Sequence, residues 1–434
     1  MKKYILATVI AAASIGNVYA ESLWDIYKLA QDHDPSLRSA AATYEAQKEE
    51  VTITKGNLFP DITFNGNLGY SNTDSPAFDG HRTSHSLSLN MNYPIYSPAL
   101  GYAVDAVEIN FDRAAIDYEN AKENLALQSL TEYFDLLTAQ ATLKNTEAQV
   151  RSNASQLDRV TKQFDVGLVS ITDMQDAQAA YDAVKVRSLS AYSDVLKAQQ
   201  ALYQRTGKKI TKIPELSSDY EIQIDGDMTV EQLIPKAKKN NTDIKTLNLA
   251  VQAAETNIQI QESNGRSPTV VLTGSLSRSN SDASPSGSSD GSTTDASIGL
   301  GVSIPLYKGG AINASVRKSV ASAESVKESR EAALQTLELN IRSLYLDLET
   351  SVAQVEAQAQ LIRSRTSALE ATQAGYDAGI RNLVELLTAQ SNLYDAQNTY
   401  QQLRYGFVIQ HLNLLELIGE LSEEEIRQLD SWLK

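Results

Sequence analysis

The sequence predicts a mixed α+β fold that is mostly α-helical and is built from two copies of one structural plan. The first observation is a stretch that occurs twice, at residues 164–181 and 376–393, running aromatic, Asp, small, Gly and aliphatic before a helix-forming segment. The second is a pair of 64-residue runs without Gly or Pro, at 103–166 and 311–374. One such helix would be roughly 96 Å long at about 1.5 Å per residue, which is too long for a globular core.

The repeated stretch indicates an internal duplication. Gly167 aligns with Gly379, and residues on both sides of each Gly match at the same offset of 212 residues. Gly is the expected break between two helices because it adopts a left-handed cap without steric cost. We therefore predict two helix–turn–helix tips in two structural repeats, residues 21–213 and 214–434.

Residues 1–20 have the pattern of a secretory signal peptide. Lys2 and Lys3 precede an apolar run from Ile5, and the segment ends at a predicted cut after Ala20. A transmembrane anchor is the alternative, but this run is shorter than the ~20 residues that span a bilayer. The pattern therefore predicts an exported mature chain.

The composition excludes several classes of protein. The 434 residues carry a formal net charge of −16, which argues against a nucleic-acid partner because no basic stripe is available to meet phosphates. The absence of Cys rules out disulfides and thiolate metal sites. After the signal segment, no apolar run is long enough for a transmembrane helix, whereas a β-barrel crossing stays open.

No residues in the sequence suggest catalysis. Of the four His, only His81 and His85 are spaced like metal ligands, and in their polar loop we expect them to be solvated; no Gly-rich phosphate loop follows a predicted strand. We therefore predict no enzymatic activity, no cofactor and no metal.

Each half of the chain is predicted to contain a helix, two strands around a loop, a long helix, a tip and a second long helix. The predicted strands are 62–71, 86–96, 269–277 and 297–307, with loops 71–85 and 279–296 between them. The predicted long helices are 103–166, 168–206, 311–374 and 380–418.

The strands are predicted from strict alternation of apolar and small polar residues, as in Leu87, Leu89 and Met91 against Ser88 and Asn90. This alternation is typical of membrane barrels, whose strands run about 9–11 residues. Four strands cannot close a barrel, so the chain must pool strands with one or two further copies. A soluble sandwich is the alternative, since its strands also alternate.

The long helices lack a wide apolar stripe, because Ala, Gln, Ser, Thr and Glu share their positions with scattered Leu and Val. An ordinary coiled coil would show continuous Leu or Ile at two positions of each heptad. This composition favours helices packed side by side around a wet interior. A solvated fibrous coiled coil is the alternative.

Three motifs at these spacings resemble the outer membrane efflux protein family. They are Val-Gly-Leu-Val-Ser-Ile-Thr-Asp-Met-Gln at 166–175, Gly-Tyr-Asp-Ala-Gly-Ile-Arg-Asn-Leu-Val-Glu-Leu-Leu at 375–387, and Ile-Pro-Leu-Tyr-Lys-Gly-Gly at 304–310. The resemblance covers essentially the whole mature chain. It implies a homotrimer in which a 12-stranded outer-membrane β-barrel, with four strands per chain, continues into a 12-helix periplasmic α-barrel. Residues 207–235 and 419–434 would form a small equatorial domain.

The resemblance also implies a function. The chain would be the outer-membrane exit channel of tripartite efflux pumps and of type I secretion, conducting drugs, exported proteins or both. Its partners would be a periplasmic adaptor protein, an inner-membrane pump or ABC transporter, and outer-membrane lipid. The alternative is a non-conducting periplasmic coiled-coil adaptor or stalk, and the four amphipathic strands favour the channel.

Family members hold the periplasmic entrance shut through links between an inner and an outer coil. The matching positions here are Tyr376 and Arg381 on the inner coil, and Thr172 and Asp173 on the outer coil. The resemblance therefore implies that these four residues are gating links. The alternative is that they only solvate the helix tips, since exposed pairs contribute little.

Family members also carry two acidic residues, one helical turn apart, around the constriction. The first matches Glu385, but the second position is occupied by Thr388, which halves the expected negative lining. Asp176 is related to Thr388 by the duplication and is a candidate to supply part of the missing charge. We therefore assign Glu385, Thr388 and Asp176 to the constriction as expectations.

Overall fold

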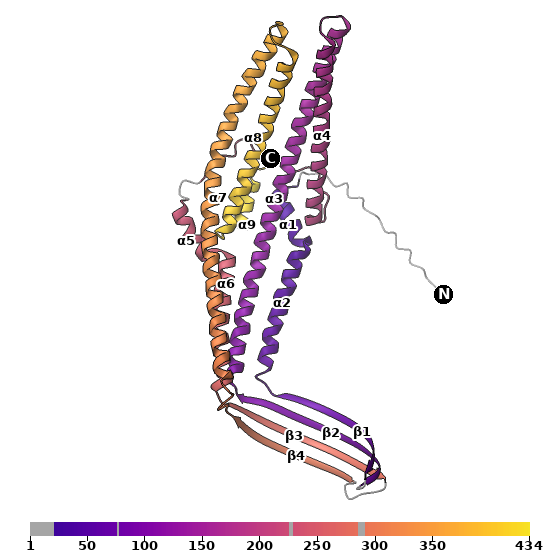
Figure 1. The fold of residues 1–434 in the computed structure, drawn as a ribbon, viewed down its shortest axis with the longest axis vertical. Helices are drawn as coiled ribbons and strands as arrows, with labels where there is room; N and C mark the ends of the chain where they lie inside the picture. Colours follow the sequence, from indigo (N-terminus) through magenta and orange to yellow (C-terminus); the bar gives the residue numbers. More distant parts are fainter. Residues whose placement is uncertain (1–20, 76–77, 225–228, 285–290) are drawn as a thin grey trace, which may run out of the picture.

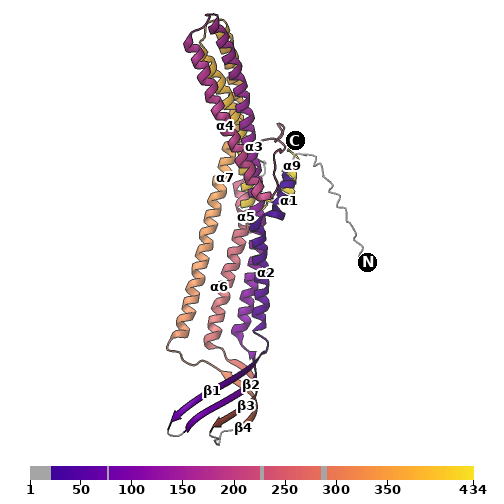
Figure 2. The ribbon, with the colours of Figure 1, turned by 90° about the vertical axis from the view of Figure 1, so that its right-hand side faces the viewer.

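The protein is an elongated molecule in which long helices run along one axis and a sheet bends away at one end (Figures 1 and 2). The computed structural model describes residues 21–75, 78–224, 229–284 and 291–434. The predicted signal peptide, residues 1–20, lies outside the described residues. Two helical hairpins point away from the sheet, and their tips form the opposite end of the molecule (Figure 1).

Within the described residues, the two halves of the chain contain the same six elements in the same order, and the second half ends with one further helix, α9. The first half contains α1 (Leu23–His33), α2 (Pro35–Gly56), β1 (Asp61–Ser75), β2 (Phe78–Tyr96), α3 (Pro98–Asp165) and α4 (Ile171–Thr206). The second contains α5 (Val230–Asn240), α6 (Thr242–Arg266), β3 (Thr269–Ser284), β4 (Gly291–Ser303), α7 (Ala311–Asp377), α8 (Leu383–Leu417) and α9 (Glu423–Asp430). The first hairpin is α3–α4, and the second hairpin is α7–α8.

The strands are longer at the sheet's outer end than we predicted. Residues 71–85 were expected to be a loop, yet β1 continues to Ser75 and Asn72 pairs with His81 of β2. Likewise β3 and β4 extend into residues 279–296. The apolar alternation stops there, but the hydrogen bonds of the ladder join main-chain groups and need no apolar side chain. The prediction was also wrong at the other end of β4, which stops at Ser303, before Pro305, because Pro has no amide donor.

The four strands form one antiparallel sheet in the order β1-β2-β3-β4. Phe64 is paired with Leu89, and Leu89 with Leu276, so one face of the sheet is continuously apolar. On β1, the side chains of this face are exposed in the single chain, at 68% for Phe64 and 82% for Leu68. The sheet therefore presents an apolar face that the chain itself does not cover.

The boundaries of the long helices are set by their caps. The helix α3 begins at Pro98 and not at 103, because Pro is well suited to the first turn of a helix. At the tips, α4 and α8 begin three residues later than predicted, after the caps Ser170 and Asn382. The helix α7 continues through Gly375 to Asp377. Among the described helices, none is both long enough and apolar enough to cross a membrane.

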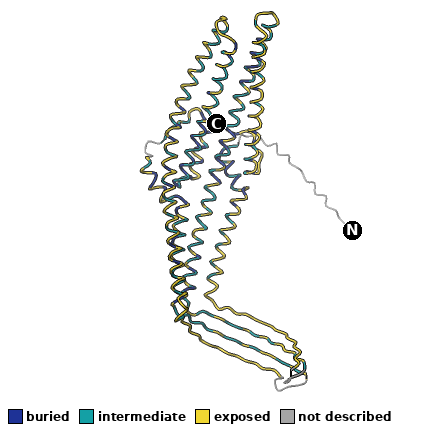
Figure 3. The backbone as a smooth tube through the Cα atoms, in the orientation of Figure 1, coloured by how far each residue is buried: buried dark blue, intermediate teal, exposed yellow. Residues whose placement is uncertain are grey.

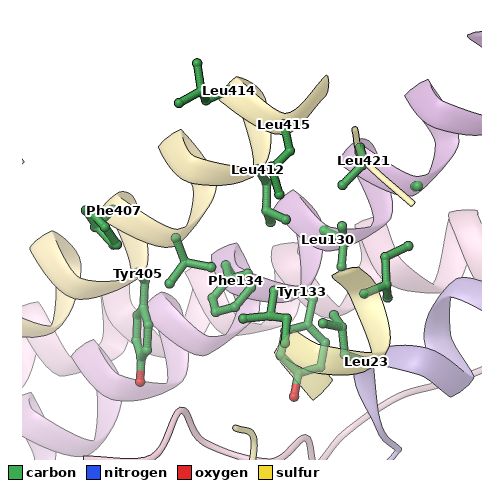
Figure 4. Close-up of a cluster of buried hydrophobic side chains, with 14 of the residues drawn as sticks. Leu23, Leu130, Tyr133, Phe134, Tyr405, Phe407, Leu412, Leu414, Leu415 and Leu421 are labelled. Carbon is green, nitrogen blue, oxygen red and sulfur yellow. The ribbon is translucent and has the colours of Figure 1, made fainter. Parts of the chain in front are cut away.

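The main apolar core lies midway along the helices, where Figure 3 shows most of the buried residues. Its largest buried side chains include Tyr133, Phe134 and Phe407, which Figure 4 shows among leucines of α8 and α1. Residues 207–224 and 419–434 meet beside this core, where Leu216 pairs with Leu433 in an antiparallel bridge. This region, with α1, α5 and α9, is called the equatorial body below.

Candidate functional site

The two hairpin tips turn in the same way. Gly167 and Gly379 have φ angles of 76° and 75°, a left-handed conformation that favours Gly. The amide of Leu168 donates to the carbonyl of Gln163, and that of Ile380 donates to the carbonyl of Gly375, both at 2.8 Å. Each bond satisfies a carbonyl at the end of a helix. The structure thus confirms the two helix–turn–helix tips that the duplication predicted.

Thr172 and Asp173 lie in the first turn of α4, where they take part in its N-cap. The Ser170 hydroxyl accepts a hydrogen bond from the Asp173 amide at 3.1 Å, and Asp173 Oδ2 accepts from the Ser170 amide at 3.0 Å. The hydroxyls of Ser170 and Thr172 lie 2.5 Å apart. This capping box fixes the direction of the Asp173 carboxylate.

Arg381 and Glu385 form an ion pair at the start of α8. Arg381 Nη1 donates to Glu385 Oε2 at 3.0 Å, and the cap residue Asn382 accepts from the Glu385 amide at 2.8 Å. The Arg381 side chain lies over Gly375, where an added Cβ would come within 2.7 Å of Arg381 Cγ. The absence of a side chain at Gly375 therefore gives Arg381 the room for this position.

Tyr376 packs against a small apolar cluster that joins the two hairpins near their tips. The cluster's buried members are Val160, Ala177 and Leu383, from α3, α4 and α8. Burial raises the pKa of the Tyr376 hydroxyl, and the nearby carboxylate of Asp173 raises it further.

The four predicted gating residues are thus only partly brought together. Within the described part of this single chain, no hydrogen bond joins Tyr376 or Arg381 to Thr172 or Asp173. Arg381, in the turn before α8, is paired with Glu385 of the same hairpin. The gating links stay a prediction.

The three predicted constriction residues line neighbouring grooves beside α8. Glu385 and Thr388 line one groove together with Arg365 of α7. Thr388 lines a second groove together with Asp176 of α4. Asp176 therefore lies close to the position where the second acidic residue was expected. Whether it supplies charge to the constriction stays a prediction.

Two ion pairs between the hairpins were missed by sequence reasoning. Arg159 Nη1 of α3 lies 4.0 Å from Asp377 Oδ1 of α7, and Arg187 Nη1 of α4 lies 3.8 Å from Asp395 Oδ1 of α8. The partners are in different repeats and have no shared motif, so no pattern in the sequence could have paired them. Across the part of the chain that the structure describes, no group of three His, Asp or Glu side chains is placed to hold a metal ion.

Comparison with known proteins places this architecture in a family. The model of the outer membrane efflux protein family matches residues 26–208 and 233–420. Outer membrane protein TolC of Vibrio cholerae is 30% identical over 441 residues, which cover 100% of this chain and 99% of the relative. Outer membrane protein TolC of Escherichia coli is also 30% identical, over 95% of this chain and 85% of the relative.

Solved structures share the fold at lower identity. CusC, whose crystal structures concern transmembrane channel formation, superposes with a TM-score of 0.80 at 18% identity and 92% coverage of both chains. The Campylobacter jejuni CmeC outer membrane channel superposes with a TM-score of 0.78 at 16% identity, covering 100% of this chain and 97% of the other.

These neighbours are described as membrane channels, and their shared fold confirms the predicted fold class of a β-barrel joined to an α-barrel. The family and its TolC members confirm the predicted location in the outer membrane. They also favour the channel over the non-conducting adaptor or stalk. The chain therefore belongs to the outer membrane efflux protein family, which is made up of channel proteins, and it is an outer-membrane exit channel.

Proposed function

We propose that this chain works as a homotrimer with a gated periplasmic entrance, to which a periplasmic adaptor and an inner-membrane pump or ABC transporter deliver drugs or exported proteins. Some relatives are named as secretion proteins and others as efflux pump proteins. Proteases secretion protein PrtF of Dickeya chrysanthemi is 23% identical, and the probable efflux pump outer membrane protein TtgC of Pseudomonas putida is 21% identical. On this proposal the chain is a passive conduit and not an enzyme.

The observation that supports trimer formation is the sheet itself. Its apolar face is exposed, and β1 and β4 are its outer strands. Unpaired main-chain groups at a sheet edge are costly in lipid, so β1 of one chain must pair with β4 of another. Three copies would supply twelve strands in a closed barrel. The polar, exposed faces of α3, α4, α7 and α8 would then surround the aqueous conduit.

The tips supply the gate in this proposal. Tyr376 and Arg381, on the second hairpin, hold it against Thr172 and Asp173 of the first. The Asp173 carboxylate, whose direction the α4 cap fixes, raises the pKa of the Tyr376 hydroxyl, and this electrostatic influence supports one of these links. Arg381 lies exposed at its tip beside Gly379, where it can exchange Glu385 for an acceptor on another coil.

Glu385 would form a negative ring at the constriction, because a three-fold axis repeats its carboxylate around a narrow opening. Asp176 would add charge beside Thr388, and their shared groove supports this role. In this structure the ion pair with Arg381 offsets part of the Glu385 charge. Transfer of Arg381 from Glu385 to an acceptor on another coil would therefore close the gate and strengthen the negative ring together.

Single-channel conductance in a planar bilayer tests the proposal. The double variant Tyr376→Phe, Arg381→Ser removes one hydroxyl and one guanidinium from the tips, and its conductance should rise several-fold over the parent. Glu370→Gln changes an exposed residue of α7 outside the tip and serves as the matched control. Mass measurement in detergent should give three chains per particle. A stable monomer that inserts into bilayers, or an unchanged conductance, would contradict the proposal.

A further inference from the structure

Two ion pairs join the hairpins, and in both the arginine belongs to the first hairpin and the aspartate to the second. Arg159 of α3 faces Asp377 of α7 at 4.0 Å, and Arg187 of α4 faces Asp395 of α8 at 3.8 Å. None of these four residues is among the predicted gating or constriction residues. We call these two pairs the charge clamp.

The two pairs lie at different depths below the tips. Arg159 is eight residues before Gly167, and Arg187 is twenty residues after it. At ~1.5 Å per residue along the first hairpin, Arg159 lies about 12 Å from Gly167 and Arg187 lies about 30 Å from it. The charge clamp therefore connects the hairpins near their free ends and again further down.

Uncharged hydrogen bonds connect the same hairpins on another side. Asn145 Nδ2 of α3 donates to the Tyr394 carbonyl of α8 at 2.7 Å, and Thr142 Oγ1 donates to Asn398 Oδ1 at 2.9 Å. These contacts hold α8 against α3, whereas Arg187 holds α8 from α4. Nearer the tip, Arg159 connects α3 directly to α7, beside Tyr376.

We propose that the charge clamp holds the second hairpin against the first and so biases the entrance towards its closed state. This inference rests on the proposed gating function and adds two pairs of positioning residues to it. An outward swing of the second hairpin carries Asp377 and Asp395 away from their arginines, so opening must break both pairs.

Salt is expected to weaken the clamp. The separations of 3.8 and 4.0 Å exceed those of charge-assisted hydrogen bonds, so the attraction is mainly Coulombic. The four side chains are 52–64% exposed, which leaves them open to screening by dissolved ions. Each pair alone should shift the open-to-closed ratio by about two- to fivefold. Symmetry repeats the effect in three protomers.

The absence of Cys allows a direct measurement of the tips. Leu168→Cys and Ile380→Cys place nitroxide labels on exposed residues of the two tips, which are 74% and 81% exposed. Label distances are measured by pulsed electron resonance in mixed trimers diluted with unlabelled chain. In the variant Arg159→Gln, Arg187→Gln, the distance distribution should shift to longer values. Raising the salt concentration should shift the parent's distribution in the same direction and leave the variant's unchanged.

Two further variants separate the clamp from a merely structural role. The charge reversal Arg159→Asp with Asp377→Arg should restore the parent's distances, whereas Arg159→Asp alone should lengthen them. Arg151→Gln removes an exposed arginine of α3 that makes no ion pair within the described residues, and it should change nothing. Equal thermal unfolding midpoints for all variants would show that they are folded.

The outcomes distinguish this inference from the gating proposal. If Tyr376→Phe, Arg381→Ser raises conductance while Arg159→Gln, Arg187→Gln leaves the label distances unchanged, the gate stands and the clamp is wrong. If the parent gives no currents, the proposed channel gate fails, but the label distances still decide whether the charges hold the hairpins together. Failure of the charge reversal to restore the distances would also overturn the clamp.

Discussion

The equatorial body and the hairpin tips are held together by different kinds of contact. In the body, elements far apart in the sequence enclose Tyr133, Phe134 and Phe407, and Arg205 pairs with Asp34 at the junction of α1 and α2 and with Glu132 of α3. At the tips, most polar contacts lie within one helical turn, as in Arg381 with Glu385. The difference indicates a fixed middle and tips that can separate without unfolding the body.

The two tips also differ from each other in charge, although their backbones match. Ser170 and Asn382 occupy equivalent positions and cap their helices in the same way. Arg381, however, is equivalent to Val169, which belongs to the apolar cluster of the first tip. The duplication has kept the turn and has placed an arginine at this position of the second tip only. The proposed gating link needs this difference, because Arg381 of the second tip would bind the Asp173 carboxylate of the first.

The largest expected effect tests the contrast in packing. Phe134→Ala in the body removes a fully buried ring, and the free energy of unfolding should fall by about 3–5 kcal/mol. Leu383→Ala, in the small cluster at the tips, should cost less because neighbouring side chains near the exposed tip can close the gap. Urea unfolding followed by circular dichroism compares them. Equal losses would contradict a body that is more rigid than the tips.

The second prediction concerns Glu416 at the end of α8. Burial raises the pKa of this carboxyl to about 7, and the negative charges of Asp243 and Glu123 contribute. Because the folded pKa lies above the unfolded one, ionisation opposes folding, and stability should fall as the pH rises from ~4.5 to ~7. Glu416→Gln should remove this loss, with a gain of up to about 3 kcal/mol at pH 8 and little change at pH 4. Unfolding measured at both pH values tests it, and a gain of equal size at pH 4 would contradict it.

The third prediction concerns Asp34 in the body and has the opposite sign. Burial alone would raise the pKa of Asp34, but hydrogen bonds from Ser36 and Arg205 outweigh it and lower the pKa to about 2. The folded pKa lies below the unfolded one, so this stabilisation is complete above pH ~4 and is lost as the pH falls towards ~2. Because Arg205 supplies only part of this shift, Arg205→Gln should cost about 1 kcal/mol more at pH 6 than at pH 2. A cost that does not depend on pH would show that Arg205 acts through packing alone.

Much of this organisation could be predicted from the sequence because it depends on local patterns. Gly167 and Gly379 set the tips through their own backbone preference, and apolar alternation identified four strands. The strand ends near Asn72 and His81 were missed because main-chain pairing continues where the alternation stops. Local patterns also did not reveal the late start of α8.

Contacts between the repeats depend on how two hairpins pack, and a single sequence gives little information on this. Arg159 with Asp377 could not be predicted for that reason. The duplication was the exception, since it related Asp176 to Thr388 before the structure placed both in one groove. An internal repeat thus supplies some of the long-range information that single motifs lack.

The smallest expected effect concerns the charge at the constriction, and it tests whether the two tips share this task. Three Glu385 carboxylates around one axis would concentrate cations, so multivalent cations should block the pore from the periplasmic side. Glu385→Gln should lose both block and cation preference, whereas Thr388→Asp should tighten the block by restoring a second acidic ring. Asp176→Asn should weaken the block by less than Glu385→Gln, because Asp176 lies on α4 and only adjoins Thr388. All variants must be compared at one salt concentration, since screening changes the affinity of the blocker. If Glu385→Gln leaves block unchanged and Asp176→Asn abolishes it, the acidic ring belongs to the first tip, and the assignment of charge to the second tip is wrong.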